Sequence, residues 1–182
     1  MPSALLRPWR PAVAAAVLSA TLAGCGSSTK LAPVCPQLSL LEDAADLTRF
    51  SGPVGTPRDA RSLMLAAGIS AVPAKCGLAG KSAVEAVLHV EAQMRRGPAA
   101  SGDTAQVPYF VAITEGNHVL TEQDFVLGAT FRPNVDQVAA RGQDITLTFP
   151  ISKTKTAAAY HIYIGFRLTA EELAYNRETA QQ

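Results

Sequence analysis

The sequence predicts an all-β protein, a β-sandwich of immunoglobulin or fibronectin type III architecture with about seven strands and a short C-terminal helix. Three observations support this fold class. Apolar and polar residues alternate along several segments, two cysteines remain available for a disulfide bond, and clear helical signals are confined to the end of the chain. A small closed β-barrel is the competing architecture.

The first 24 residues have the layout of an export signal. Arg7 and Arg10 precede an apolar run from Ala12 to Leu22, and small residues follow. A membrane-spanning helix needs about 20 apolar residues, roughly twice the length of this run. We therefore expect residues 1–24 to be a signal peptide that is removed.

The residues Leu22-Ala23-Gly24-Cys25 resemble the lipobox of bacterial lipoproteins. The resemblance implies that diacylglycerol is attached to the sulfur of Cys25, that the chain is cut before it, and that the new amino group is acylated. Several acyl chains hold a protein stably on a bilayer, where one chain binds reversibly. Cys25 is therefore the expected lipidation site.

Gly26 follows the cysteine in place of the aspartate that retains lipoproteins at the inner membrane. The resemblance thus implies a lipid-anchored protein of the bacterial outer membrane that faces the periplasm, with the periplasmic face of the inner membrane as the alternative. If the signal is instead cut after Ala20 or Ala23, Cys25 is an ordinary cysteine.

Counting Cys25 as the lipid site leaves the pair Cys35 and Cys76. An even pair in an oxidising compartment is a candidate disulfide bond. Closing this loop would stabilise the fold by about 4 kcal/mol in the chain-entropy model. Two free buried thiols are the alternative, and neither cysteine has a second cysteine or a histidine at metal-ligand spacing.

The composition favours one domain after a short spacer. Residues 25–34 are polar and contain proline, so we interpret them as the lipidated N-terminus and a tether, and residues 35–182 as a single domain. Removing Arg7 and Arg10 from the 16 basic residues leaves 14 against 15 acidic ones. This balance provides no basic field to recruit nucleic acid.

Strict alternation predicts the strongest strands. In residues 84–94 the even positions from Val84 to Met94 are apolar, and the same parity returns in residues 160–168. Residues 107–114 are apolar on both faces, as expected of a central strand, and a hairpin turn at residues 115–118 leads into the next strand, where Gly128 could mark a bulge or a bend. Further strands are expected at residues 37–41, 63–72 and 144–149.

The helical signal is at the C-terminus. Thr169 and Glu172 fit the capping box, which predicts a helix from about Ala170 to Asn176. Residues 42–50 fit either a helical turn or part of a strand, and both interpretations stay open.

The sequence lacks the motifs of a serine hydrolase elbow, a phosphate-binding loop and a metal-binding His-Glu-x-x-His helix. We therefore expect no catalytic residue and no cofactor. We also expect no metal ion, because Glu42, Asp43 and Asp46 lack the spacing of a calcium loop. His89 and His161 lie on the polar parity of strong strands and would be neighbours if those strands pair. His118 is expected in the hairpin turn.

Two regions are candidate partner-binding sites. Arg95 and Arg96 end a strand before a long loop, and loops on rigid scaffolds often carry binding residues. Tyr175, Asn176 and Arg177 could form an exposed contact patch on the C-terminal helix, although a helix that covers one end of the sandwich is the alternative. Residues 165–178, together with residues 107–114, are similar to uncharacterised Gram-negative envelope lipoproteins, a resemblance that implies no activity.

The predicted function is therefore that of a lipid-anchored periplasmic envelope module. It would be a non-enzymatic interaction protein or accessory subunit with a protein partner in the envelope. The alternative is a glycan- or lipid-binding domain, hydrolytic or not, that uses the sheet face with His89 and His161. A deep pocket that contains both histidines would favour the alternative.

Overall fold

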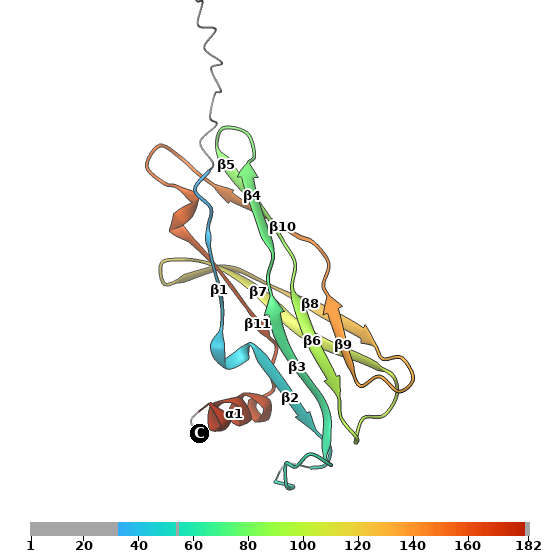
Figure 1. Ribbon diagram of the computed structural model, residues 1–182. Coiled ribbons are helices and arrows are strands. Elements are labelled where there is room, and N and C mark those ends of the chain that lie inside the picture. The colour runs from blue at the N-terminus through green and yellow to red at the C-terminus, as the bar shows by residue number, and fades with distance from the viewer. Residues whose placement is uncertain (1–32, 54, 181–182) are drawn as a thin grey trace, which may run out of the picture. The chain divides into compact units, whose positions relative to one another are not determined.

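The computed structural model describes residues 33–53 and 55–180, and these residues form the predicted all-β sandwich with one C-terminal helix (Figure 1). The predicted signal peptide and Cys25 lie outside the described residues. One layer is a four-stranded sheet in the order β1-β11-β7-β8. Its strands are β1 (Gln37–Leu40), β11 (Tyr160–Phe166), β7 (Thr104–Glu115) and β8 (His118–Thr130).

The other layer contains two sheets. The first has the order β2-β3-β6-β9, with β2 (Asp46–Phe50), β3 (Leu63–Ala71), β6 (Glu91–Arg96) and β9 (Gln137–Arg141). The second has the order β10-β5-β4, with β10 (Ile145–Pro150), β5 (Ala83–Leu88) and β4 (Ala74–Leu78). All pairs within this layer are antiparallel, whereas β1 runs parallel to β11.

The two sheets of this layer are halves of one bent surface. Strand β3 leads into β4, β5 into β6 and β9 into β10, each with only a few residues between them. Backbone hydrogen bonds continue across the bend, because the amide of His89 donates to the carbonyl of Pro73 at 3.2 Å and that of Gly142 to Val90 at 2.8 Å. The bend therefore changes the strand direction without opening the layer.

The core confirms the predicted parity. Every even residue from Val84 to Met94 is buried, as are Ile145, Leu147 and Phe149 of β10. The alternation extends through β11, where Tyr160, Ile162 and Ile164 face the opposite layer. Burial of one face on each layer supplies the main apolar stabilisation of the sandwich.

The described residues contain eleven strands, more than the seven predicted. One reason is that residues 84–94 are split at the bend, which a continuous apolar parity does not reveal. Another is that residues 42–50 combine a 3-10 turn η1 (Glu42–Ala44) with strand β2, so both open interpretations are partly correct. A second 3-10 turn, η2 (Ala157–Ala159), precedes β11.

The bulge predicted at Gly128 is not there. Gly128 pairs regularly with Gln106, and the register of the β7–β8 hairpin shifts instead between Ile113 and Thr114, where Leu120 is the extra residue on β8. The predicted hairpin turn is present, since β7 ends at Glu115 and β8 begins at His118. A left-handed Gly116, with φ +55°, allows this short connection.

The predicted disulfide bond joins Cys35 to Cys76, whose Cα atoms are 6.1 Å apart. Cys35 precedes β1 and Cys76 lies in β4, so the bond links the two layers of the sandwich. It therefore fixes the first described residues to the opposite layer.

Helix α1 (Ala170–Thr179) begins at the predicted capping box and extends three residues beyond the predicted end. The amide of Glu172 donates to the hydroxyl of Thr169 at 3.2 Å, and the Thr169 amide donates to the Glu172 carboxylate at 2.8 Å. The helix packs beside β2 and η1, at one end of the sandwich (Figure 1).

Candidate functional site

The loop that follows Arg96 lies at the same end of the sandwich as the loop between β2 and β3. Strands β3 and β6 are paired so that Leu65 lies opposite Arg96, which brings the β2–β3 loop beside the β6–β7 loop. The amide of Gly97 donates to the Met64 carbonyl at 2.9 Å and ties the start of the β6–β7 loop to the start of β3. The β6–β7 loop spans residues 97–103, because residues 104–106 belong to β7.

The β2–β3 loop is held by its own hydrogen bonds. The backbone amides of Ser62 and Arg61 donate to the carboxylate of Asp59, each at 2.9 Å. These bonds stabilise the charged form and hold the pKa of Asp59 below its usual value. The loop residues before β3 thus have a defined conformation.

The structure brings Arg95 and Tyr175 together. Arg95 is exposed on the outer face of β6, and Tyr175 lies on α1. Both side chains line two adjoining hollows with volumes of about 500 and 300 Å³. We call the larger hollow the α1 groove.

Small side chains form the floor of the α1 groove. Ala66 and Gly68 of β3 leave the sheet surface low between helix α1 on one side and Gln93 with Arg95 on the other. A groove over a sheet needs such small residues, because larger outward side chains would fill it. The remaining lining residues are Asp46, Leu47, Thr48, Ala67, Met94, Gln137, Asn176 and Thr179.

Arg95 is the cation that this groove leaves available. Among the residues that the structure describes, it forms no salt bridge. Its guanidinium can therefore accept a carboxylate or another anion without first breaking an internal pair.

Arg96 is not part of the groove. Successive residues of a strand point to opposite faces, and Arg96 lies on the parity of buried Met94. Its Nη1 donates to the carbonyl of Gly102 at 3.2 Å, and its guanidinium lies 5.5 Å from the ring centre of Phe131. The two adjacent arginines therefore have different roles. Arg95 lines the α1 groove, whereas Arg96 holds the β6–β7 loop through Gly102.

Tyr175 and Arg177 dock the helix. The Tyr175 ring meets Phe50 edge to face with centroids 5.1 Å apart, and the guanidinium of Arg58 lies 5.4 Å from the Tyr175 ring. Arg177 Nε donates to Asp43 at 2.8 Å. These contacts fit the alternative in which α1 covers an end of the sandwich.

Asn176, between them in sequence and expected in the same exposed patch, also docks the helix. Its side-chain amide donates to the backbone carbonyls of Asp43 and Asp46 at 2.9 and 2.7 Å. It therefore fixes α1 to the junction of η1 and β2. No sequence signal identifies such a pair of acceptors, because backbone carbonyls are the same at every residue.

A partly buried ion pair holds the start of the helix. Glu172 is nearly buried, and one of its oxygens accepts a hydrogen bond from Arg49 Nε of β2 at 2.9 Å. The same carboxylate caps the helix, so one side chain joins local and tertiary contacts. The capping motif predicted the local bond only.

His89 and His161 do not share a site. His89 lies at the bend between β5 and β6, whereas His161 belongs to β11 in the opposite layer, and these strands do not pair. The predicted condition for their proximity is therefore not met. Both lie on the outward parity of their layers, so they face opposite sides of the sandwich.

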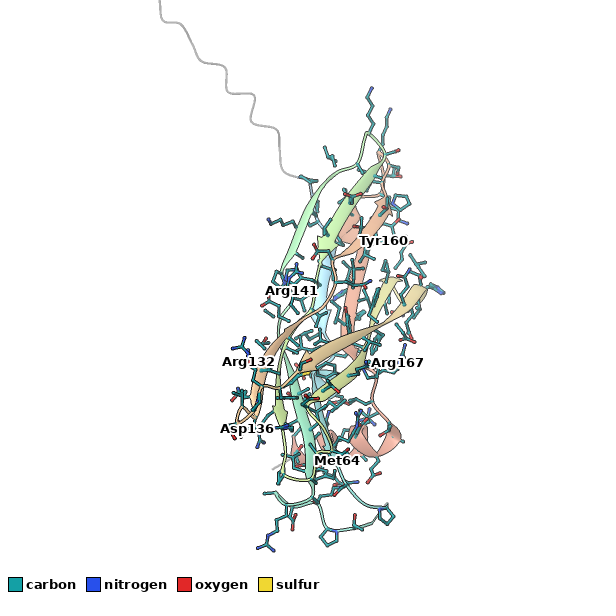
Figure 2. All side chains as sticks on the ribbon, turned by 90° about the vertical axis from the view of Figure 1, so that its right-hand side faces the viewer. Met64, Arg132, Asp136, Arg141, Tyr160 and Arg167 are labelled. Atoms are coloured by element: carbon teal, nitrogen blue, oxygen red, sulfur yellow. A yellow bond between two sulfur atoms is a disulfide. The ribbon has the colours of Figure 1, made fainter. Side chains whose placement is uncertain are left out.

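The contacts of His89 are with charged neighbours at the bend. Its Nε2 lies 3.0 Å from Glu91 and its Nδ1 lies 3.5 Å from Asp144, which is also paired with Arg141 at 2.6 Å. The two carboxylates flank opposite sides of the imidazole and do not converge. Arg141 contacts His89, whereas Arg167 directly follows β11, the strand that carries His161. These two arginines lie on opposite sides of the molecule (Figure 2).

The contacts of His161 are with its own sheet. Its Nε2 lies 2.8 Å from the hydroxyl of Ser39 on β1, and its ring stacks on Tyr163 with centroids 4.2 Å apart. His118, expected in the turn, is the first residue of β8 and is exposed.

Within residues 33–53 and 55–180, no group of three or more His, Cys, Asp or Glu side chains has the geometry to hold a metal ion. No helix in this described part of the chain has the length and apolar character required to cross a bilayer. No protein-family model, curated protein or solved structure matches the chain.

Proposed function

We propose that this chain is a lipid-anchored module of the bacterial envelope that binds a protein partner without catalysing a reaction. The anchor would be the acylated sulfur and amino group of Cys25, and the domain would face the periplasm from the outer membrane. The support for the anchor is the sequence Leu22-Ala23-Gly24-Cys25 at the end of an apolar leader.

The observation that supports partner binding is the α1 groove with Arg95 at its wall. The groove combines a floor of small residues, polar amides and an unpaired guanidinium. These features suit an extended polar segment that carries an acidic side chain, because a guanidinium binds a carboxylate in two parallel hydrogen bonds. A partner segment of this kind would contact Tyr175 at the same time, since Tyr175 lines the same hollow.

The anchor is tested by replacing Cys25 with serine. We expect wild-type chain labelled with a radioactive fatty acid to fractionate with membranes, and the C25S variant to be unlabelled and soluble. A labelled C25S chain that stays with the membrane would rule out Cys25 as the lipid site. Export itself is monitored separately by formation of the Cys35–Cys76 disulfide.

Partner binding is tested by crosslinking the anchored chain in intact cells and purifying it. We expect a defined crosslinked partner with the wild type and loss of that species in the Arg95→Glu variant. Lys81→Glu, an equal charge reversal at the exposed β4–β5 turn, is the matched control and should retain the partner. Retention of the species by Arg95→Glu would exclude the α1 groove as its site.

A further inference from the structure

The free edge of β8 is a second surface with the properties of a binding site, separate from the α1 groove. Among the described strands, β8 ends its sheet and pairs with β7 alone. Residues 118–124 are exposed over their whole length, and the β7–β8 hairpin projects beside the sandwich (Figure 1). An edge of this kind presents backbone donors and acceptors that can pair with another strand.

Two other edges of the described sheets are covered or tied. β2 packs against α1, and β4 is bonded through Cys76 to Cys35. The C-terminal part of β8 approaches β9, so the open stretch is its N-terminal half. Seven extended residues span about 23 Å, enough to pair with a short peptide segment.

Apolar side chains gather on this strand. Val119, Leu120 and Val126 are 64%, 52% and 58% exposed, and all three belong to β8. Leu120 is also the residue left without a partner by the register shift in the hairpin. Exposed apolar residues are common singly, whereas several on one edge strand indicate a contact surface.

The outer face of the same edge is acidic. Glu122 and Asp124 are both paired with the guanidinium of Arg167, so two carboxylates share one cation. Arg167 is held in place because its guanidinium stacks over the Phe110 ring, 4.6 Å from the centroid. One negative charge is therefore left on the edge.

We propose that residues 118–124 bind an extended segment of a partner protein by strand addition, and that this segment places a lysine or arginine beside Glu122 and Asp124. Main-chain hydrogen bonds to β8 supply affinity, and alternate side chains supply specificity. On the outer face, the partner's cation pairs with the carboxylates and an aliphatic residue meets Val126. Val119 lies on this face too, because it pairs with Thr114 across the register shift, and it meets a second aliphatic residue.

A second copy of this chain fits the edge less well. Antiparallel pairing of two β8 edges brings Glu122 and Asp124 of one copy close to the same residues of the other, and like charges across a strand pair are destabilising. A basic segment instead removes the remaining charge of the edge. The proposed occupant is therefore a basic, apolar strand from another protein.

The test uses the full-length chain and two synthetic octapeptides. In one peptide the alternate positions that share a face carry valine, lysine, lysine and valine in that order, with threonine between them, and in the other glutamate replaces lysine. We expect the lysine peptide to bind, to slow amide hydrogen exchange in residues 118–124, and to bind more weakly as salt is raised. Equal binding of both peptides, or protection confined to other residues, would overturn the proposal.

Two variants sharpen the test. Glu122→Gln combined with Asp124→Asn should weaken binding of the lysine peptide roughly three- to tenfold, the range of exposed ion pairs. Glu85→Gln, which removes an exposed carboxylate from the central strand β5, should bind like the wild type. If the chain alone dimerises with protection of residues 118–124, the occupant is a second copy and the proposed partner is wrong.

Discussion

The hydroxyl of Tyr109 lies against Gly142 in the centre of the sandwich, where β9 approaches the bend. A Cβ atom placed on Gly142 would be 2.8 Å from the Tyr109 oxygen. Tyr109 is fully buried, and its hydroxyl has no hydrogen-bond partner among the described residues. This contact couples a strand of one layer to the bend of the other.

Tyr109→Phe should keep or raise the free energy of unfolding, by up to about 1 kcal/mol, because it removes a buried hydroxyl that forms no hydrogen bond. The ring and its stacking on Phe125, with centroids 5.4 Å apart, are retained. Urea unfolding of the two proteins measures the difference. A loss of more than about 1 kcal/mol would show that the hydroxyl does have a partner.

Tyr109 should also make the fold sensitive to alkaline pH. Burial raises the pKa of Tyr109 in the folded protein above the unfolded value of about 10. Below pH 10 both states keep the proton, and above it the unfolded chain loses the proton first, so stability falls as pH rises. The free energy of unfolding should therefore fall less steeply between about pH 10 and 11 in Tyr109→Phe than in the wild type. Equal slopes would contradict this.

Gly142→Ala should destabilise the fold by about 1–3 kcal/mol, because the added methyl group meets the Tyr109 oxygen. The next nearest atoms, from Leu127 and Val90, are at 3.4 Å and need only small shifts. In the Tyr109→Phe background the same substitution should cost less, by about 1 kcal/mol. A double-mutant cycle from urea unfolding gives this coupling, and strict additivity would argue against the contact.

Glu172→Ala should lower the free energy of unfolding by roughly 2 kcal/mol, because it removes both the capping bond to Thr169 and the partner of Arg49. Urea unfolding measures the loss, and circular dichroism reports the helix. Glu171→Ala is the matched control, since Glu171 is exposed and pairs only with Arg58. That control should change stability by less than about 1 kcal/mol. An equal loss of unfolding free energy in both variants would mean that the buried contacts of Glu172 do not stabilise the fold.

Reduction of the Cys35–Cys76 bond should lower the free energy of unfolding by about 4 kcal/mol, from the entropy that the loop regains in the unfolded chain. Unfolding by urea with and without reductant measures this difference. The Cys35→Ser and Cys76→Ser variants should each match the reduced wild type. An unchanged midpoint after complete reduction would show that the bond does not stabilise the fold.

The strands were predicted from the alternation of apolar and polar residues, and the structure keeps this alternation even where a strand is interrupted. Val84, Leu88 and Met94 point inward on both sides of the bend, because burial depends on side-chain alternation and not on unbroken hydrogen bonding. The bend at His89 could not be foreseen, since nothing interrupts the apolar positions there. Gly128 misled because glycine permits a bulge without requiring one.

The candidate site was less predictable than the fold. Arg95 and Arg96 looked alike in sequence, yet adjacent strand residues point to opposite faces, and only Arg95 reaches the α1 groove. The proximity of Tyr175 to Arg95 depends on how α1 returns across β2, a long-range arrangement that no local pattern encodes. Pairing of β11 with β1 and β7, and not with β5 or β6, separated the two histidines.

The bond between Cys35 and Cys76 also has a mechanical consequence. A pull on the chain at Val34 acts first on Cys35, and the covalent bond transmits that tension to β4, in the layer opposite β1. Strand β1 is held by four residue pairs at the edge of its sheet and would otherwise be peeled away one hydrogen bond at a time. With the proposed N-terminal anchor, the load would thus be carried past β1, the shortest of the described strands.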